Sequence, residues 1–230
     1  MVGVVTVLPM FPLGSVLFPG AVLPLHVFEP RYRQMVQDCL SDEAHEFGVV
    51  LIQRGSEVGG GDVRADVGVV ARMVQVAEMP DGRYAVISVG ARRIKVNAWL
   101  PDDPYPLADV DEFPDGELRD ERGSADRSSP QPWSPARLAA VTQRVRRCSA
   151  LALELGDDVG DPSDDVDDDV RVASYQLCRL APLSTHDEYR LLCAYSPYER
   201  LSLLEDMLDD LEALLQFRLH ADGPIEDPTQ

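Results

Sequence analysis

The chain has 230 residues, a hydrophobic content of 45% and a formal net charge of -19 at pH 7, from 21 basic and 40 acidic residues. This length and composition indicate a soluble globular protein with one large domain or two modest ones. Because a strongly negative field repels phosphate backbones and acidic lipid surfaces, the charge disfavours non-specific nucleic-acid binding and membrane attachment.

Five prolines interrupt an apolar run between residues 8 and 36, LPMFPLGSVLFPGAVLPLHVFEPRYRQMV. Proline fixes φ and lacks a backbone N–H, so no long helix passes through this run. We expect a strand over residues 4 to 8, an apolar loop with turns at Leu13-Gly14 and Pro19-Gly20, and a strand over residues 21 to 28. The prolines place the second strand at an edge, an end or a bulge of its sheet.

A helix is predicted to begin at Pro30, which suits the first helical position. Its apolar face consists of Tyr32, Met35, Val36, Cys39 and Leu40. Arg31 and Arg33 lie in the first turn, where the helix dipole disfavours a cation by about 0.3 to 1 kcal/mol. Glu29 is the expected partner of one of them. The segment FEPRYR is then either a recognition surface or an internal ion pair, and the ion pair is favoured.

Short apolar segments joined by turns continue to residue 112. Strands are predicted over residues 47 to 53, 67 to 77, 84 to 89, 92 to 99 and 107 to 112, with a hairpin turn at Asp81-Gly82 and a bulge or bend at Gly90. In the strand over 92 to 99, Ile94, Val96 and Ala98 are expected to face inward, and Arg93, Lys95 and Asn97 outward. The Gly-rich residues 55 to 66 lack the Gly-Lys-Ser/Thr of a phosphate-binding loop, so we expect a connection between strands. Strands at this spacing indicate a closed or nearly closed barrel.

Residues 113 to 134 are rich in Pro, Gly, Ser and charged residues and are predicted to be a flexible linker or insertion. Helices are expected from Pro135 to about Gly156, over 170 to 180, over 185 to 194 with a Thr185–Glu188 capping box, and from the capping box at Ser196 onward. The leucine stripe of the last helix is interpreted as bundle core rather than as a dimer seam. Residues 221 to 230 are predicted to be a disordered tail.

The acidic residues 157 to 169, DDVGDPSDDVDDD, do not fit a calcium-binding EF-hand. In the closest alignment Val170 stands where glycine is required and Gln176 where the bidentate glutamate belongs. A solvated loop is favoured over a cation site. The four cysteines form no CxxC pair and the four histidines no ligand cluster, so we expect buried free thiols, no metal and no cofactor.

Several motifs in order resemble the Lon N-terminal, substrate-binding domain family. They are FPLGSVLFPG, LPLHVFEPRYRQMV, FGVVLIQRG, VGVVARM, DGRYAV and VGARRIKV. The chain is most similar to the small bacterial proteins that carry this domain without the protease. The resemblance implies a PUA-like pseudo-barrel. Full-length Lon proteases need a lysine in an ATP site and another in a Ser-Lys dyad, whereas the only lysine here is Lys95, so we expect no enzyme and no catalytic residue.

The predicted fold class is therefore α+β: residues 1 to 112 form a β pseudo-barrel with one early helix, and residues 135 to 220 form a helical bundle region. The resemblance implies non-catalytic binding of unfolded or degron-bearing polypeptides, with a protease or chaperone as a further partner. The candidate substrate-binding residues are Phe11, Leu17, Phe18, Phe28, Glu29, Arg31 and Tyr32. We expect a cytoplasmic monomer or homodimer.

Two alternatives stay open. PUA-like barrels elsewhere bind RNA, which would require a basic patch. The residues available for it are Arg72, Arg83, Arg92, Arg93 and Lys95. A small-molecule-binding protein or enzyme would instead require a pocket with perturbed titratable groups, although the sequence contains no G-x-S-x-G, HExxH or GxGxxG motif in the required context.

Overall fold

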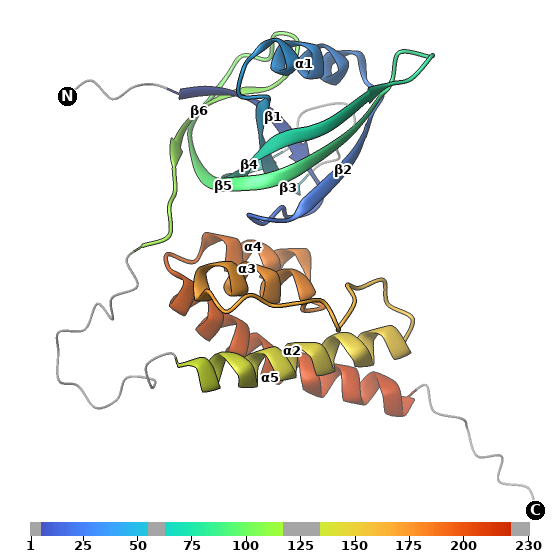
Figure 1. Ribbon diagram of the computed structural model, residues 1–230, viewed down its shortest axis with the longest axis vertical. Helices are drawn as coiled ribbons and strands as arrows, with labels where there is room; N and C mark the ends of the chain where they lie inside the picture. The colour runs from blue at the N-terminus through green and yellow to red at the C-terminus, as the bar shows by residue number, and fades with distance from the viewer. Residues whose placement is uncertain (1–5, 55–62, 117–133, 222–230) are drawn as a thin grey trace, which may run out of the picture. The chain divides into compact units, whose positions relative to one another are not determined.

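The computed structural model describes residues 6–54, 63–116 and 134–221. The chain divides into two units, Met1–Asp115 and Gly116–Gln230. Figure 1 shows strands and one helix in the first unit, coloured blue to green, and helices in the second, coloured yellow to red. The first unit contains β1 (Thr6–Leu13), β2 (Val22–Val27), α1 (Pro30–Ser41), β3 (Glu46–Arg54), β4 (Val63–Glu78), β5 (Tyr84–Leu100) and β6 (Leu107–Glu112).

The described strands form one sheet in the order β2-β5-β4-β3-β1-β6, and an additional pairing between β5 and β6 closes it into a barrel. Among the described strands, only β1 and β3 run parallel to each other. β2 lies outside the closed ring, and β5 is its one partner among these strands. The predicted α+β class and barrel are confirmed, as is the edge position expected for the proline-containing second strand.

One bulge allows β5 to serve two sets of neighbours. The sequence predicts two strands here, whereas the structure has one strand of 17 residues, whose pairing with β4 shifts at Gly90. The residues before the shift pair with β2 and those after it with β6. The proline-rich loop is fastened at the same point, since Gly20 N donates to Gly90 O (2.8 Å) and Gly90 N donates to Ala21 O (2.9 Å). The predicted bulge is confirmed.

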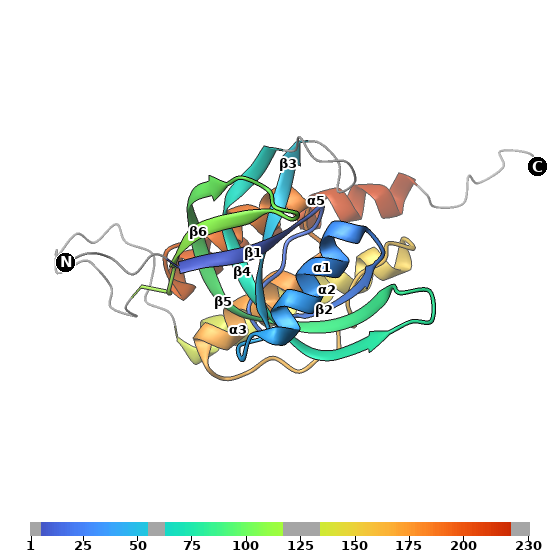
Figure 2. The same ribbon diagram turned by 90° about the horizontal axis from the view of Figure 1, so that it is seen from above.

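Two layers of apolar side chains hold the first unit together. The barrel core contains Met10, Val50, Val70, Ile94, Val96, Ala108 and Val110. α1 lies on one side of the barrel (Figure 2), with Met35 and Val36 buried beneath it. Polar contacts fix its position: Gln37 Nε2 donates to the Tyr84 hydroxyl oxygen (3.1 Å), and the Tyr105 hydroxyl donates to Asp38 Oδ2 (2.8 Å).

Arg93 is the main departure from the predicted strand pattern. It was expected to face outward, yet its exposed fraction is only 3%. The Phe113 ring lies 4.4 Å from its guanidinium carbon, and its Nη2 lies 2.7 Å from an Asp115 carboxylate oxygen. These contacts attach the first residues of the predicted linker to the barrel, and the compact first unit extends to Asp115. Most of the predicted linker, residues 117 to 133, and residues 222 to 230 of the predicted tail lie outside the described residues.

The second unit consists, in its described residues, of α2 (Pro135–Glu154), α3 (Val170–Leu180), α4 (Thr185–Cys193) and α5 (Pro197–Ala221). The leucine stripe is bundle core as predicted, with Leu201, Leu204, Leu208 and Leu215 buried. Ion pairs join the two long helices along their length, Arg137 to Glu205 and Arg144 to Glu212. No helix among the described residues has the length and apolar character needed to cross a bilayer.

A fully buried arginine stands at the polar centre of the helical unit. Arg200 is 0% exposed and donates to Ser174 Oγ (2.8 Å), the Tyr175 hydroxyl oxygen (3.0 Å) and the Leu191 carbonyl oxygen (3.2 Å). Its guanidinium carbon also lies 3.8 Å from the centroid of the Tyr175 ring. A buried cation is costly unless its donors are hydrogen-bonded, and these contacts offset that cost. Because the partners lie on α3 and α4, the contacts also connect these helices with α5.

The capping box of α4 lies one residue earlier than predicted. Ser184, not Thr185, is the N-cap, and its Oγ accepts from Asp187 N (3.2 Å) and donates to Asp187 Oδ2 (2.7 Å). Glu188 is therefore free of the capping role and lies half-buried, and burial raises its pKa from 4.5 to about 7. The raised pKa of Glu188 makes the stability of the helical unit depend on pH.

We expect Gly90→Ala to lower the free energy of unfolding of the first unit by about 1 to 3 kcal/mol, because overpacking against rigid backbone is not relieved by side-chain rotation. A Cβ at this position would lie 2.3 Å from the Phe18 carbonyl oxygen. Denaturant unfolding measures the change. Gly160→Ala is the control, since its Cβ would meet only Leu180 Cδ1 at 3.5 Å. An equal effect of both substitutions would contradict the packing argument.

Glu188 should make the helical unit less stable as pH rises from 4.5 to 7. Its pKa is raised in the folded state, so its contribution is complete below the unfolded pKa and is lost as pH passes the folded pKa. We expect Glu188→Gln to remove a fall of roughly 1 to 3 kcal/mol in the free energy of unfolding over this range. Denaturant unfolding at several pH values tests this, with exposed Glu154→Gln as the control. If the free energy of unfolding of Glu188→Gln fell with pH as steeply as that of the wild type, a group other than Glu188 would be responsible for the pH dependence.

Candidate functional site

Four of the predicted binding residues come together at the start of α1. The rings of Phe11 and Tyr32 stack with their centroids 4.2 Å apart, and the Arg31 guanidinium carbon lies 4.6 Å from the Tyr32 centroid. Arg31 Nε donates to Glu29 Oε2 (3.0 Å). The predicted ion pair is confirmed and offsets the unfavourable position of Arg31 in the first turn.

Three of the candidate substrate-binding residues are buried. The exposed fractions are 6% for Leu17, 2% for Phe18 and 4% for Tyr32. For Leu17 and Phe18 the physical reason is the attachment of their loop to Gly90. Tyr32 instead lies on the buried face of α1 and stacks on Phe11. Phe11 is half-buried. Phe28 differs from all of these, because 56% of its side chain is exposed.

Phe28 follows a row of exposed side chains on β2. Along this strand Val22, Pro24 and His26 are exposed, whereas the residues between them are half-buried or buried. Val22 has an exposed fraction of 57%. Since successive side chains of a strand point to opposite faces, these three residues lie on one face of the sheet.

The neighbouring strands extend this face. The register places Val89, Ile87 and Ala85 of β5 directly beside Val22, Pro24 and His26. The same β5 residues pair on their other side with residues of β4. We call this surface the outer face: Val22, Pro24, His26, Ala85, Ile87, Val89, Arg72, Gln75 and Ala77. Most of these residues are apolar, which is typical of a surface that contacts another apolar segment.

The edge of β2 beside the outer face has no strand partner among the described residues. An open edge usually invites strand addition, because unpaired backbone groups lie along it. Pro24 in the middle of β2 has no N–H to offer to an added strand. A ligand would therefore contact the outer face through side chains more than through a continuous backbone ladder.

Four of the five residues of the basic patch required by the RNA alternative are paired with carboxylates. Arg72 pairs with Glu46 (2.9 Å), Arg83 with Asp81 (2.7 Å), and Arg92 with both Glu46 (2.9 Å) and Glu112 (3.1 Å). Arg93 is buried against its own carboxylate partner. Hydrogen bonds from Arg83 hold the pKa of Asp81 below its ordinary value. Arginines committed to carboxylates leave little positive field for phosphate groups.

The thiols of the described residues were predicted to be buried and free and the potential metal ligands to be unclustered, and the structure describes both. Burial raises the pKa of Cys39 and Cys178 to about 12 and that of Cys148 to about 11. These thiols stay protonated at neutral pH and are poor nucleophiles. Across the described ranges, no three His, Cys, Asp or Glu side chains converge in a way that would hold a metal ion.

Sequence comparison connects this geometry with known proteins. Residues 7–210 match the family described as the ATP-dependent protease La (LON) substrate-binding domain. Lon protease 2 of Sorangium cellulosum is 32% identical over 157 residues, which are 63% of this chain and 19% of that protein. Lon protease of Anaeromyxobacter dehalogenans is 36% identical over 118 residues, 50% of this chain and 14% of that protein. The chain thus spans less than a fifth of the length of these relatives.

Two solved structures share the fold. The Lon N-terminal domain protein from Xanthomonas campestris is 30% identical, with a TM-score of 0.60 over 88% of this chain and 98% of that one. The N-terminal domain of Mycobacterium avium complex Lon protease is 18% identical, with a TM-score of 0.57 over 89% of this chain and 99% of that one. The second likeness concerns the fold alone.

Substitutions should separate the buried from the exposed members of the predicted set. We expect Phe18→Ala to lower the free energy of unfolding by about 3 to 5 kcal/mol, because it empties a packed core position. Val22→Ser and Phe28→Ser should each change it by less than about 0.5 kcal/mol, as surface substitutions do. Denaturant unfolding measures all three. A loss at Phe28 as large as that at Phe18 would show that Phe28 is a core residue.

Proposed function

The chain belongs to the LON substrate-binding domain family, and from this membership we propose that it binds exposed apolar segments of unfolded or degron-bearing polypeptides. The outer face of β2, β5 and β4 is the proposed binding surface. The observation that carries the proposal is the exposure of Val22 (57%) and of the adjoining Phe28 (56%) next to an open sheet edge. Burying such side chains is favourable by roughly 25 cal/mol per Å² of apolar area.

The geometry supports weak, sequence-tolerant binding. Apolar contacts are not directional, so a surface of valine, isoleucine, alanine and proline side chains accepts many apolar sequences. Pro24 prevents a regular backbone ladder along β2, which limits the affinity that backbone hydrogen bonds could add. Such a surface suits a protein that must recognise many unfolded clients rather than one folded partner.

In this proposal the chain contributes recognition and not catalysis. Its relatives are named as proteases, but the matched region covers 19% of the first of them. Lys95, the only lysine of the chain, is exposed on β5 between Val67 of β4 and Asp111 of β6. Degradation of a bound client within protein quality control would then be the task of a protease, with or without a chaperone that passes the client on. We propose that the chain acts in the cytoplasm.

Fluorescence anisotropy of a labelled, permanently unfolded polypeptide tests the proposal, with a labelled RNA at two salt concentrations beside it. We expect saturable polypeptide binding that persists at high salt. The double variant Val22→Ser/Phe28→Ser should raise the dissociation constant about tenfold, since the lost contacts amount to roughly 1.4 kcal/mol.

Leu40→Ser is the matched control, because Leu40 is 41% exposed on α1 and outside the outer face. It should leave the dissociation constant unchanged within about twofold. If Leu40→Ser weakened polypeptide binding as much as the double variant does, the outer face would not be the binding surface. Binding of RNA with a steep salt dependence, and none of polypeptide, would overturn the proposed function in favour of the RNA alternative.

A further inference from the structure

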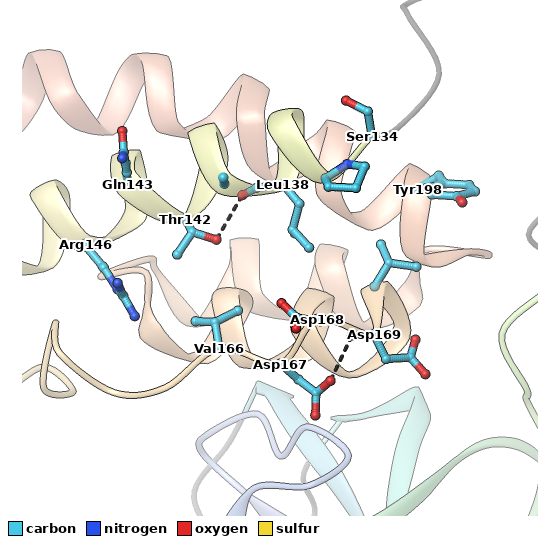
Figure 3. Close-up of a pocket in the computed structure, with 13 residues that line it drawn as sticks. Ser134, Leu138, Thr142, Gln143, Arg146, Val166, Asp167, Asp168, Asp169 and Tyr198 are labelled. Atoms are coloured by element: carbon cyan, nitrogen blue, oxygen red, sulfur yellow. Dashed lines mark hydrogen bonds between the residues drawn. The ribbon is translucent and has the colours of Figure 1, made fainter.

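A groove of about 870 Å³ lies within the helical unit, and none of its lining residues belongs to the outer face. It runs between the first half of α2 and the residues that lead into α3, and Tyr198 of α5 lies at one end (Figure 3). Its volume falls within the range of roughly 300 to 1,000 Å³ that is typical of ligand sites. The groove therefore has room for several side chains of a partner.

One wall of the groove offers apolar contacts. Leu138 and Thr142 point from α2 toward the segment that carries Val166 and Asp168 (Figure 3). The Thr142 hydroxyl donates to the Leu138 carbonyl oxygen (2.9 Å), which leaves its methyl group to line the groove. Val170 and Tyr198 complete the apolar part of the lining.

The opposite wall is acidic. Asp167, Asp168 and Asp169 are exposed and line the groove in succession. Within the described parts of the chain none of these three carboxylates is in an ion pair, although Asp157 and Asp164 of the same loop pair with arginines. Asp167 and Asp169 accept backbone hydrogen bonds, from Asp169 N and Arg171 N respectively.

The groove has one basic lining residue, Arg146, and its Nη2 already donates to the Asp164 carbonyl oxygen (3.0 Å). The formal charge of the lining is therefore -2 at neutral pH, from three aspartates and one arginine. The carboxylates form no metal-binding cluster in the part of the chain that the structure describes. A partner that neutralises them must carry separate positive charges spaced along its length.

We propose that this groove binds a basic, amphipathic polypeptide segment in which apolar residues alternate with lysine or arginine. The apolar side chains contact Leu138, Val166 and Tyr198, and the cations lie against Asp167 to Asp169. Charge complementarity of this kind raises the association rate and excludes acidic partners, while the apolar contacts slow dissociation. The site adds charge selectivity to a protein whose proposed outer face selects for apolar character alone.

The test uses the full chain and a fluorescein-labelled peptide of alternating lysine and leucine. Two matched peptides have glutamate in place of lysine, or serine in place of leucine. We expect anisotropy to show saturable binding of the first peptide, weakened but not abolished by salt, no binding of the glutamate peptide, and at least about tenfold weaker binding of the serine peptide.

Two variants place the binding in the groove. Asp168→Lys should weaken the lysine–leucine peptide about five- to tenfold, whereas Asp158→Lys, an exposed position of the same loop outside the groove, should change it by less than about twofold although the net charge changes equally. Leu138→Ser should weaken it similarly, with Leu153→Ser, an exposed α2 position outside the groove, as its control. Circular dichroism confirms that each variant is folded.

Equal effects of Asp168→Lys and Asp158→Lys would show that the peptide responds to overall negative charge, and the groove proposal would be wrong. Absence of binding by wild type, or equal binding of the glutamate peptide, would also overturn it. The Val22→Ser/Phe28→Ser variant should bind this peptide as wild type does, and Asp168→Lys should bind the unfolded polypeptide unchanged. The groove proposal and the outer-face proposal can therefore be disproved independently of each other.

Discussion

Closure of the barrel depends on a close backbone approach at Gly90. One strand, β5, pairs with β2 before this residue and with β6 after it. A single strand can turn between two sets of partners only where an extra residue bends it, which is what a bulge provides. The carbonyl of Phe18 occupies the space that a side chain at residue 90 would need. The bend in β5, the closure of the barrel and the course of the proline-rich loop therefore all depend on Gly90.

The same arrangement determines which apolar residues reach solvent. Because the ring closes through β5 and β6, β2 is left outside it with one unpaired edge. The side chains of Tyr84, Val86 and Ser88 point to the covered side of β5 and are buried. Their neighbours along the strand must point to the opposite side. The outer face is therefore a geometrical consequence of closing the barrel, and its apolar composition is the feature that needs a functional explanation.

The order and type of the elements could be predicted because they depend on local patterns. The continuous apolar run of β3, proline at the first position of α1 and the Ser196 cap are each determined by a few consecutive residues. The site could not be predicted in this way. Both sets of alternating residues on β2 are largely apolar, so periodicity cannot say which set faces the core, and Phe18 is buried through a contact with a residue far along the chain. Arg93 and Arg200 likewise owe their burial to Asp115, Ser174 and Tyr175, which other elements supply.

The Arg93–Asp115 pair also matters for the mechanics of the first unit. A pull on the chain beyond residue 115 is borne first by a charged pair of which the arginine side chain is 1% exposed and the aspartate side chain 12%. Behind it lies β6, which is bonded to β1 on one side and to β5 on the other, so many hydrogen bonds must break before the strand leaves the sheet. Tension from the C-terminal direction is therefore transmitted to a strand that is paired on both of its edges.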